Sequence, residues 1–168
     1  LGGFLNFSLG YMWYIEMYIG LYILIPFVNL MYAGLKTQKH KQALLAILII
    51  TTVIPHTLNS FKPIFPNYFD AIWPLAYYFF GAYIAEYGFN LSIKKQAIIA
   101  TFAYLVTVIS VEVQILFFSK NTYYNVMSNW DTASVFVYSI FLFSILLKLN
   151  FRKIPKKLQK PITLLAKL

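Results

Sequence analysis

The sequence predicts an all-α, polytopic transmembrane helical bundle with about five spans of about 20 residues each. Of its 168 residues, 60% are hydrophobic, 20% are aromatic and only 11% are charged, whereas a soluble domain carries about 25% charged residues. The apolar runs are longer than strands and lack an alternation of apolar and polar residues, which favours helices. A water-soluble fold of this size could not bury so much apolar surface, so lipid is expected to surround much of it.

Five apolar segments are expected to form the spans. A crossing helix needs about 20 mainly apolar residues, because the hydrocarbon interior offers no partner for free backbone groups. The first segment holds the run MWYIEMYIGLYILIPFVNLMYAGL, and the second holds ALLAILIITTVI. The expected segments are residues 12–35, 42–60, 68–87, 95–118 and 130–149.

The basic residues predict the orientation of these segments. All of the 14 lysines and arginines except Lys62 and Lys120 lie after the first, third and fifth segments. Because cytoplasmic loops are enriched in lysine and arginine, the N-terminus is expected outside and the C-terminus in the cytoplasm. An odd number of crossings agrees with this. Residues 152–168 are expected to form a cytoplasmic basic segment that either lies in the interface or leads to another span.

Turn-forming and capping residues mark the outer helix ends. The loop SFKPIFPNYFD contains two prolines and an asparagine, which interrupt helices. Asp70 is expected to cap the third helix, and Pro74 to lie in its first turn, where proline is tolerated. Asn129 or Asp131 is expected to cap the fifth helix. Trp and Tyr near the span ends are typical of an interfacial belt.

Composition excludes several kinds of site. The chain has no cysteine, and its two histidines, His40 and His56, are too far apart in sequence to indicate a metal site. The net charge of +9 is explained by topology signals and contact with anionic lipid rather than by binding of nucleic acid. The oligomeric state is not indicated. The chain begins with Leu1 and ends within a partly apolar run, so it is expected to be a piece of a larger membrane protein.

Few residues could carry chemistry. Glu16 is interpreted either as a carboxylate in an outward-facing pocket or as an acid that reaches headgroup water. Pro26 either opens a cavity by kinking its helix or serves ordinary packing. His56 is a possible general base, although a polar role at the membrane edge is favoured. Glu112 and Gln114 are open to the same two interpretations. No phosphate-binding loop or nucleophile elbow is present.

Two stretches resemble the membrane-bound acyltransferase type 3 family. In a signature helix of that family, a tryptophan is followed nine residues on by tyrosine and thirteen on by proline, as in Trp13, Tyr22 and Pro26. The stretch WPLAYYFFGAYIAEY at residues 73–87 is similar to a later helix of the family. The residues that match this later helix are Pro74, Tyr77, Tyr78, Gly81, Tyr83 and Ile84.

The resemblance implies an enzyme that transfers an acyl group, usually acetyl from acetyl-CoA, to a hydroxyl of a cell-surface polysaccharide or lipid-linked sugar. It implies about ten membrane-spanning helices of about 20 residues, of which residues 1–168 would be the middle and later part. The catalytic histidine and arginine of the family would lie upstream of Leu1, and the piece alone is expected to be inactive. The expected location is a bacterial inner membrane.

Site residues follow from the same resemblance. Trp13 and Tyr14 would stack on a sugar ring, Glu16 would bind its hydroxyls, and the lysine-rich inner loops would attract the phosphates of CoA. Many family members carry an acid five residues after the tryptophan, where this chain has Tyr18; its acid, Glu16, comes three after. This departure points to the subgroup that acts on capsule-like or exopolysaccharide sugars.

Two other interpretations remain open. Kinked helices also line the path of a transporter or flippase for a glycan or lipid, and inverted repeats in the full chain would favour that function. The chain could also be an inactive truncated remnant. A preceding span with a histidine and an arginine-rich inner loop would favour the enzyme.

Overall fold

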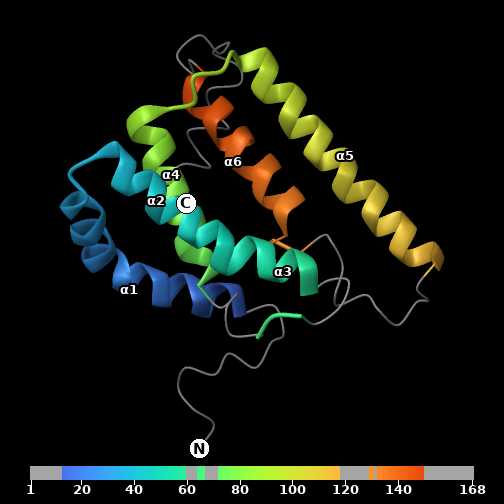
Figure 1. Ribbon diagram of the computed structural model, residues 1–168, viewed down its shortest axis with the longest axis horizontal. Coiled ribbons are helices and arrows are strands. Elements are labelled where there is room, and N and C mark those ends of the chain that lie inside the picture. The colour runs from blue at the N-terminus through green and yellow to red at the C-terminus, as the bar shows by residue number, and fades with distance from the viewer. Residues whose placement is uncertain (1–12, 60–63, 67–71, 118–128, 131, 150–168) are drawn as a thin grey trace, which may run out of the picture.

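The computed structural model describes residues 13–59, 64–66, 72–117, 129–130 and 132–149, with Trp13 and Phe117 described by their backbone only. Within these residues the fold is all-α, as predicted, and contains no strand. Five helical rods make up the bundle (Figure 1). Their elements are α1 (Trp13–Gly34), α2 (Gln38–Leu48), η1 (Ile49–Val53), α3 (Ile54–Asn59), α4 (Trp73–Tyr87), α5 (Ile93–Phe117) and α6 (Ala133–Lys148).

Three rods are long and apolar enough to cross a membrane. These are Tyr14–Gly34, Gln38–Asn59 and Ile93–Leu116. Among the described residues, α4 and α6 are shorter, with 15 and 16 residues. Large apolar side chains point outward from α1 and α5, such as Leu30 (71% exposed) and Phe102 (68% exposed). Surfaces of this kind are stable against lipid or against further helices.

The second rod contains one wide turn. Between α2 and α3, the π-helical segment η1 accommodates an extra residue in the helix. Thr51 and Thr52 donate hydroxyl hydrogen bonds to the carbonyls of Ile47 and Leu48, at 2.8 and 2.6 Å. These bonds satisfy side-chain hydroxyls inside an apolar rod, and the rod continues as α3.

Helix α4 lies at the centre of the bundle. Its Ala76, Phe79, Phe80, Tyr83 and Ile84 are all buried, and Phe79 is only 1% exposed. The buried cluster around them also takes in Val28 from α1, Leu45 and Leu48 from α2 and Phe136 from α6. Helix α5 packs along α6 and forms the outer edge of the bundle (Figure 1).

Successive rods alternate in direction, and this gives the bundle two chemically different ends. At one end, Lys41 at the start of α2 pairs with Glu86 at the end of α4, and Lys148 at the end of α6 binds the carbonyl of Leu91 just before α5. We call this the lysine-rich end. At the other end, which we call the aromatic end, Trp73 at the start of α4 meets Trp130 before α6.

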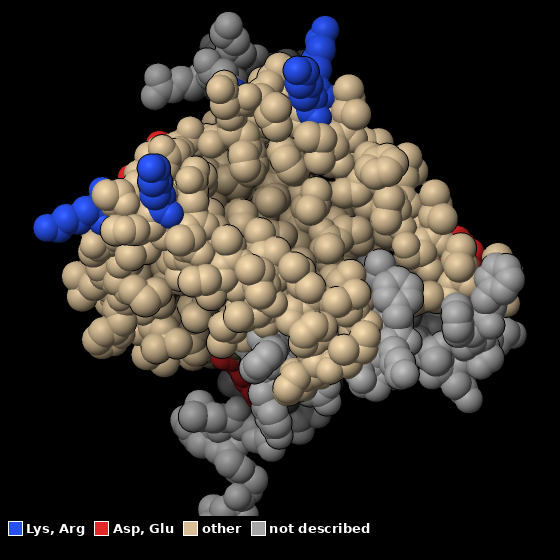
Figure 2. Space-filling view, in the orientation of Figure 1, with Lys and Arg blue, Asp and Glu red and all other residues tan. Residues whose placement is uncertain are grey.

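Charge is sparse between these ends. Figure 2 shows lysine side chains grouped toward one side of the molecule, with a broad uncharged surface beside them. Glu16 lies in the first turn of α1, at the aromatic end, and Glu112 lies near the end of α5. The described lysines thus lie toward one end of the bundle, as their clustering in sequence predicts.

Helix ends differ from the sequence prediction in two places. The second rod begins at Gln38, four residues before its predicted start, because the Thr37 hydroxyl accepts a hydrogen bond from the amide of His40 and caps it. Helix α6 has Thr132 as its N-cap, not Asn129 or Asp131. Pro74 lies in the first turn of α4, as predicted. The predicted caps Asp70 and Asp131, and the basic segment 152–168, lie outside the described residues.

The first amide of α6 is capped from another helix. The Thr57 hydroxyl of α3 accepts from the amide of Ala133 at 2.8 Å and donates to the carbonyl of Val53 at 2.6 Å. Thr57→Val keeps the shape but removes this acceptor, so we expect it to lower the free energy of unfolding by about 1 kcal/mol. Thermal unfolding in detergent would measure the loss. Thr57→Ser retains the hydroxyl and is expected to match the parent; equal stability of all three proteins would refute the capping role.

Pro26 does not interrupt α1. The helix continues through it to Gly34, and the α1 ribbon changes direction part-way along (Figure 1). The proline ring is exposed and lines neither of the two cavities described below.

Candidate functional site

A cavity of about 790 Å³ opens at the aromatic end between α1, α4 and α6. Most of its wall is aromatic, and we call it the aromatic vestibule. Its aromatic lining residues are Tyr14, Tyr18, Trp73, Tyr77, Trp130 and Tyr138. A concave apolar site with a few polar groups is the usual form of a small-molecule site.

Helical spacing explains how α1 forms one wall. Tyr14, Met17, Tyr18 and Leu21 all line the vestibule, and their separations of three and four residues put them on one face of the helix. The rings of Tyr14 and Tyr18 stack, with centroids 6.4 Å apart and an interplanar angle of 25°. They therefore present a continuous aromatic surface.

The opposite wall is built from α4 and the residues before α6. The rings of Trp73 and Trp130 lie 6.4 Å apart at an interplanar angle of 32°. Tyr77, one turn after Trp73, meets it edge to face at 5.8 Å. The Tyr77 hydroxyl donates a hydrogen bond to the backbone carbonyl of Trp130, which ties the start of α6 to α4.

Helix α3 supports the same wall from behind. The side-chain amide of Asn129 lies 3.3 Å from Nε2 of His56, and Thr57 caps Ala133. His56 thus contacts the residue next to Trp130 but is not itself a lining residue of the vestibule. The polar role favoured for His56 at the membrane edge stays a prediction.

A second cavity of about 570 Å³ runs from the vestibule along α4. We call it the apolar slot. The two cavities share Leu21, Pro74, Tyr77 and Ser139 as lining residues. Beyond these, the slot is lined by Tyr78, Gly81, Ala82, Ile84, Ala85, Ile140 and Phe143. The two cavities therefore adjoin, and the lining changes from mainly aromatic in the vestibule to mainly aliphatic in the slot.

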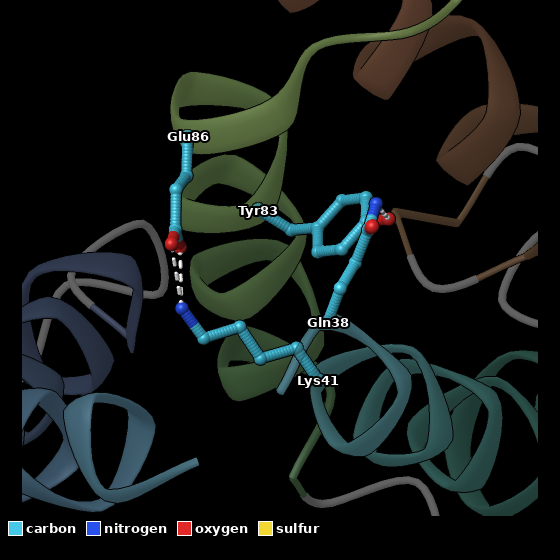
Figure 3. Close-up of polar contacts among 4 residues, drawn as sticks. All are labelled: Gln38, Lys41, Tyr83 and Glu86. Carbon is cyan, nitrogen blue, oxygen red and sulfur yellow. Dashed lines mark hydrogen bonds and ion pairs between the residues drawn. The ribbon is translucent and has the colours of Figure 1, made fainter. Parts of the chain in front are cut away.

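A polar cluster holds α2 against α4 at the lysine-rich end. The Lys41 ammonium contacts both carboxylate oxygens of Glu86, at 2.7 and 2.6 Å (Figure 3). It also lies over the rings of Tyr32 and Tyr87, at 4.5 and 5.4 Å from their centroids. Lys41 is buried, whereas the Glu86 side chain is 42% exposed.

Two glutamines extend this cluster along α2. The side-chain amides of Gln38 and Gln42 donate to the Tyr83 hydroxyl at 2.9 and 2.8 Å. Figure 3 shows Gln38 and Lys41 reaching from α2 to Tyr83 and Glu86 on α4. The side chains of Gln38, Gln42 and Lys41 on α2 are all bonded to Tyr83 or Glu86 on α4, so the cluster serves to fasten two helices. The described residues contain no group of histidines and acids that could hold a metal ion.

Comparison with known families shows which family the chain belongs to. The family model of the acyltransferase domain, acyltransferase 3, matches residues 1–168, which is the whole chain. The chain belongs to the acyltransferase 3 family. No curated protein and no solved structure gives a significant match.

Some of the family-like residues of this acyltransferase 3 family chain line the two cavities. Helix α4 is the stretch that resembles a later family helix, and Pro74, Tyr77, Tyr78 and Gly81 from it line the two cavities. Tyr83 belongs to the polar cluster at the other end. In α1, Tyr22 is exposed on the outer surface.

Of the three candidate substrate residues, Tyr14 and Glu16 are not brought together. Tyr14 lines the vestibule, whereas Glu16 is exposed and is not a lining residue. Two residues beyond Tyr14 corresponds to about 200° around a helix, so Glu16 lies on the other face of α1. Trp13 starts the helix, and its side chain lies outside the described part.

Sequence reasoning missed most of the vestibule. The sequence identifies Trp73, Tyr77 and Trp130 only as residues of an interfacial belt or as family-like positions, not as a shared wall. All three residues lie near predicted outer ends of helices, and this could have indicated the shared wall. Helix ends that meet at one side of a bundle bring their aromatic residues together.

Proposed function

We propose that this chain is part of an integral membrane O-acyltransferase that moves an acetyl group from acetyl-CoA to a hydroxyl of a cell-surface polysaccharide or lipid-linked sugar. The aromatic vestibule carries the proposal, since the broad faces of Trp73 and Trp130 suit the apolar face of a sugar ring. Membership of the acyltransferase 3 family supports acyl transfer as the chemistry.

The proposed reaction exchanges a thioester for an ester. The sugar hydroxyl oxygen attacks the acetyl carbonyl carbon, a C–O bond forms, and the C–S bond to CoA breaks. The hydroxyl proton is removed by a base and ends on the CoA sulfur, so the products are the acetylated sugar and free CoA. The base and the groups that stabilise the oxyanion would come from helices preceding Leu1, where the resemblance puts the histidine and arginine.

Acetyl-CoA is expected to approach from the lysine-rich end. Lys36, Lys39, Lys94 and Lys95 are all exposed there, and cations attract the phosphates of CoA. This end would face the cytoplasm of a bacterial inner membrane, and the vestibule would face outward. Residues 1–168 would then form part of one larger membrane domain, with 152–168 as a cytoplasmic basic segment.

Glu16 keeps a proposed role on a different surface. Because it lies on the face of α1 away from Tyr14, it could contact the acceptor only with a second wall from other helices. In the full-length protein, Glu16→Gln tests this role. Unchanged acetylation of the glycan would remove Glu16 from the site.

The orientation can be tested with single cysteines, since this chain has none. In a full-length protein freed of other cysteines, Ile64→Cys should react with a membrane-impermeant maleimide added to intact inner-membrane spheroplasts. Lys94→Cys should react only after the membrane is opened. Both side chains are exposed, so burial does not confound the comparison. The reverse pattern would contradict the proposed topology.

The function itself is tested by gene deletion and complementation. We expect loss of alkali-labile acetyl esters from one surface glycan of the deletion strain and their return with the full-length gene. The purified enzyme should transfer label from isotopically labelled acetyl-CoA to that glycan. A glycan with unchanged ester content, together with no label transfer, would refute the proposal.

A further inference from the structure

The apolar slot has no clear use for a sugar. Among the described residues that line it, three have polar side chains, Tyr77, Tyr78 and Ser139. The Tyr77 hydroxyl donates to the carbonyl of Trp130, and the Tyr78 hydroxyl donates to Oδ1 of Asn29 at 2.7 Å. With both tyrosine donors committed, a sugar placed there would lose hydrogen bonds to water and regain few.

Small residues on α4 keep the slot open. Gly81, Ala82 and Ala85 line it side by side with the larger Ile140 and Phe143 of α6. A Cβ atom on Gly81 would meet only one ring carbon of Phe143, at 3.8 Å. The floor of the slot is therefore the backbone of α4, and a bulky side chain at position 81 would occupy the slot.

The slot opens on the apolar surface of the bundle. Phe143 is 40% exposed while it lines the slot, and Ala85 is also exposed. Helix α6 also carries exposed apolar side chains next to Phe143 in sequence and one turn beyond it, Leu142 and Leu146. A ligand in the slot would meet hydrocarbon on its walls and at its opening.

We propose that the apolar slot holds the hydrocarbon chain of a lipid-linked acceptor whose sugar occupies the aromatic vestibule. This inference rests on the proposed function and narrows its acceptor to a lipid-linked sugar. The two cavities adjoin at Leu21, Pro74, Tyr77 and Ser139, so a ligand with its sugar in the vestibule could extend its hydrocarbon chain into the slot. The pantetheine arm of the donor is a poorer occupant, because its amides would lack hydrogen-bond partners in the slot.

The test uses photolabelling of the full-length enzyme in proteoliposomes. One probe is a polyprenyl phosphate with a diazirine in its chain, and the other is phosphatidylglycerol with a diazirine in its acyl chain. Labelled peptides are mapped by mass spectrometry. We expect the prenyl probe to label Ile140 and Phe143, and unlabelled polyprenyl phosphate to displace it.

Two variants fill the slot, and a third serves as a control. Gly81→Leu is expected to reduce labelling of the α6 peptide about tenfold, equivalent to 1.4 kcal/mol of binding. Ala85→Leu, at an exposed position, should also reduce labelling, and it replaces Gly81→Leu in the test if that variant folds poorly. Ile98→Leu, on the exposed face of α5, should leave labelling unchanged.

The outcomes separate this inference from the proposed function. Equal labelling by both probes without displacement would mean that bulk lipid fills the slot, and absence of labelling would mean that protein covers it; either result overturns the inference. Acetyl transfer to the glycan by the same preparation would leave the proposed function standing in both cases. Failure of acetyl transfer with normal labelling would overturn the function and not the hydrocarbon site.

Discussion

Replacing Trp73 by alanine in the full-length enzyme is expected to raise the KM for the sugar acceptor about tenfold, the effect of losing roughly 1.4 kcal/mol of binding. The indole faces Trp130 across 6.4 Å and meets Tyr77 edge to face. Alanine would remove one of the two indole surfaces and leave its partner without support. Initial rates of acetyl transfer at varied acceptor concentration would measure the change, and the KM for acetyl-CoA should stay constant.

Conservative replacements provide the control for this prediction. Trp73→Phe retains a flat apolar ring and should recover most of the acceptor affinity. Trp130→Ala should resemble Trp73→Ala, because the two rings form one wall. If Trp73→Ala has the same KM for the acceptor as the parent, the vestibule does not bind the acceptor.

Removing one partner of the Lys41–Glu86 pair should lower stability more than removing both. Glu86→Met leaves the buried Lys41 ammonium, held by two contacts of 2.6 and 2.7 Å, without its anion. A buried charge left without its partner is costly, whereas an apolar pair of similar volume is tolerated. We expect the thermal midpoint in detergent to fall markedly for Glu86→Met.

The double variant distinguishes an ion pair from simple packing. Lys41→Met combined with Glu86→Met should recover at least half of the loss in thermal midpoint, because no unpaired charge remains. Lys39→Met removes an exposed lysine from the same helix and should behave like the parent. Additive losses in the double variant would show that the two side chains contribute independently.

The existence of the helices followed from sequence because lipid imposes a simple requirement. Every backbone group in the hydrocarbon must be paired within its own segment, so long apolar runs become helices whatever their neighbours are. The helix ends were harder to predict, since they depend on local contacts. Thr37 extends the second rod to Gln38 by capping His40, and Thr57 caps α6 from a different helix.

The candidate site was predictable only in part. Tyr14 was found through the family-like helix, and it lines the vestibule. Trp73 and Trp130 are far apart in sequence, and their meeting depends on how α4 and α6 pack. Glu16, close to Tyr14 in sequence, lies on another face of α1, because neighbours along a helix point in different directions.

The wide turn at η1 sets where α3 points. A π-helical turn holds one residue more than an α-helical turn, and one residue corresponds to about 100° of rotation. If one residue of Ile49–Val53 were lost, α3 would rotate by that angle, and Thr57 and His56 would swing away from Ala133 and Asn129. The angular setting of α3 thus governs how Trp130 is held in the wall of the vestibule.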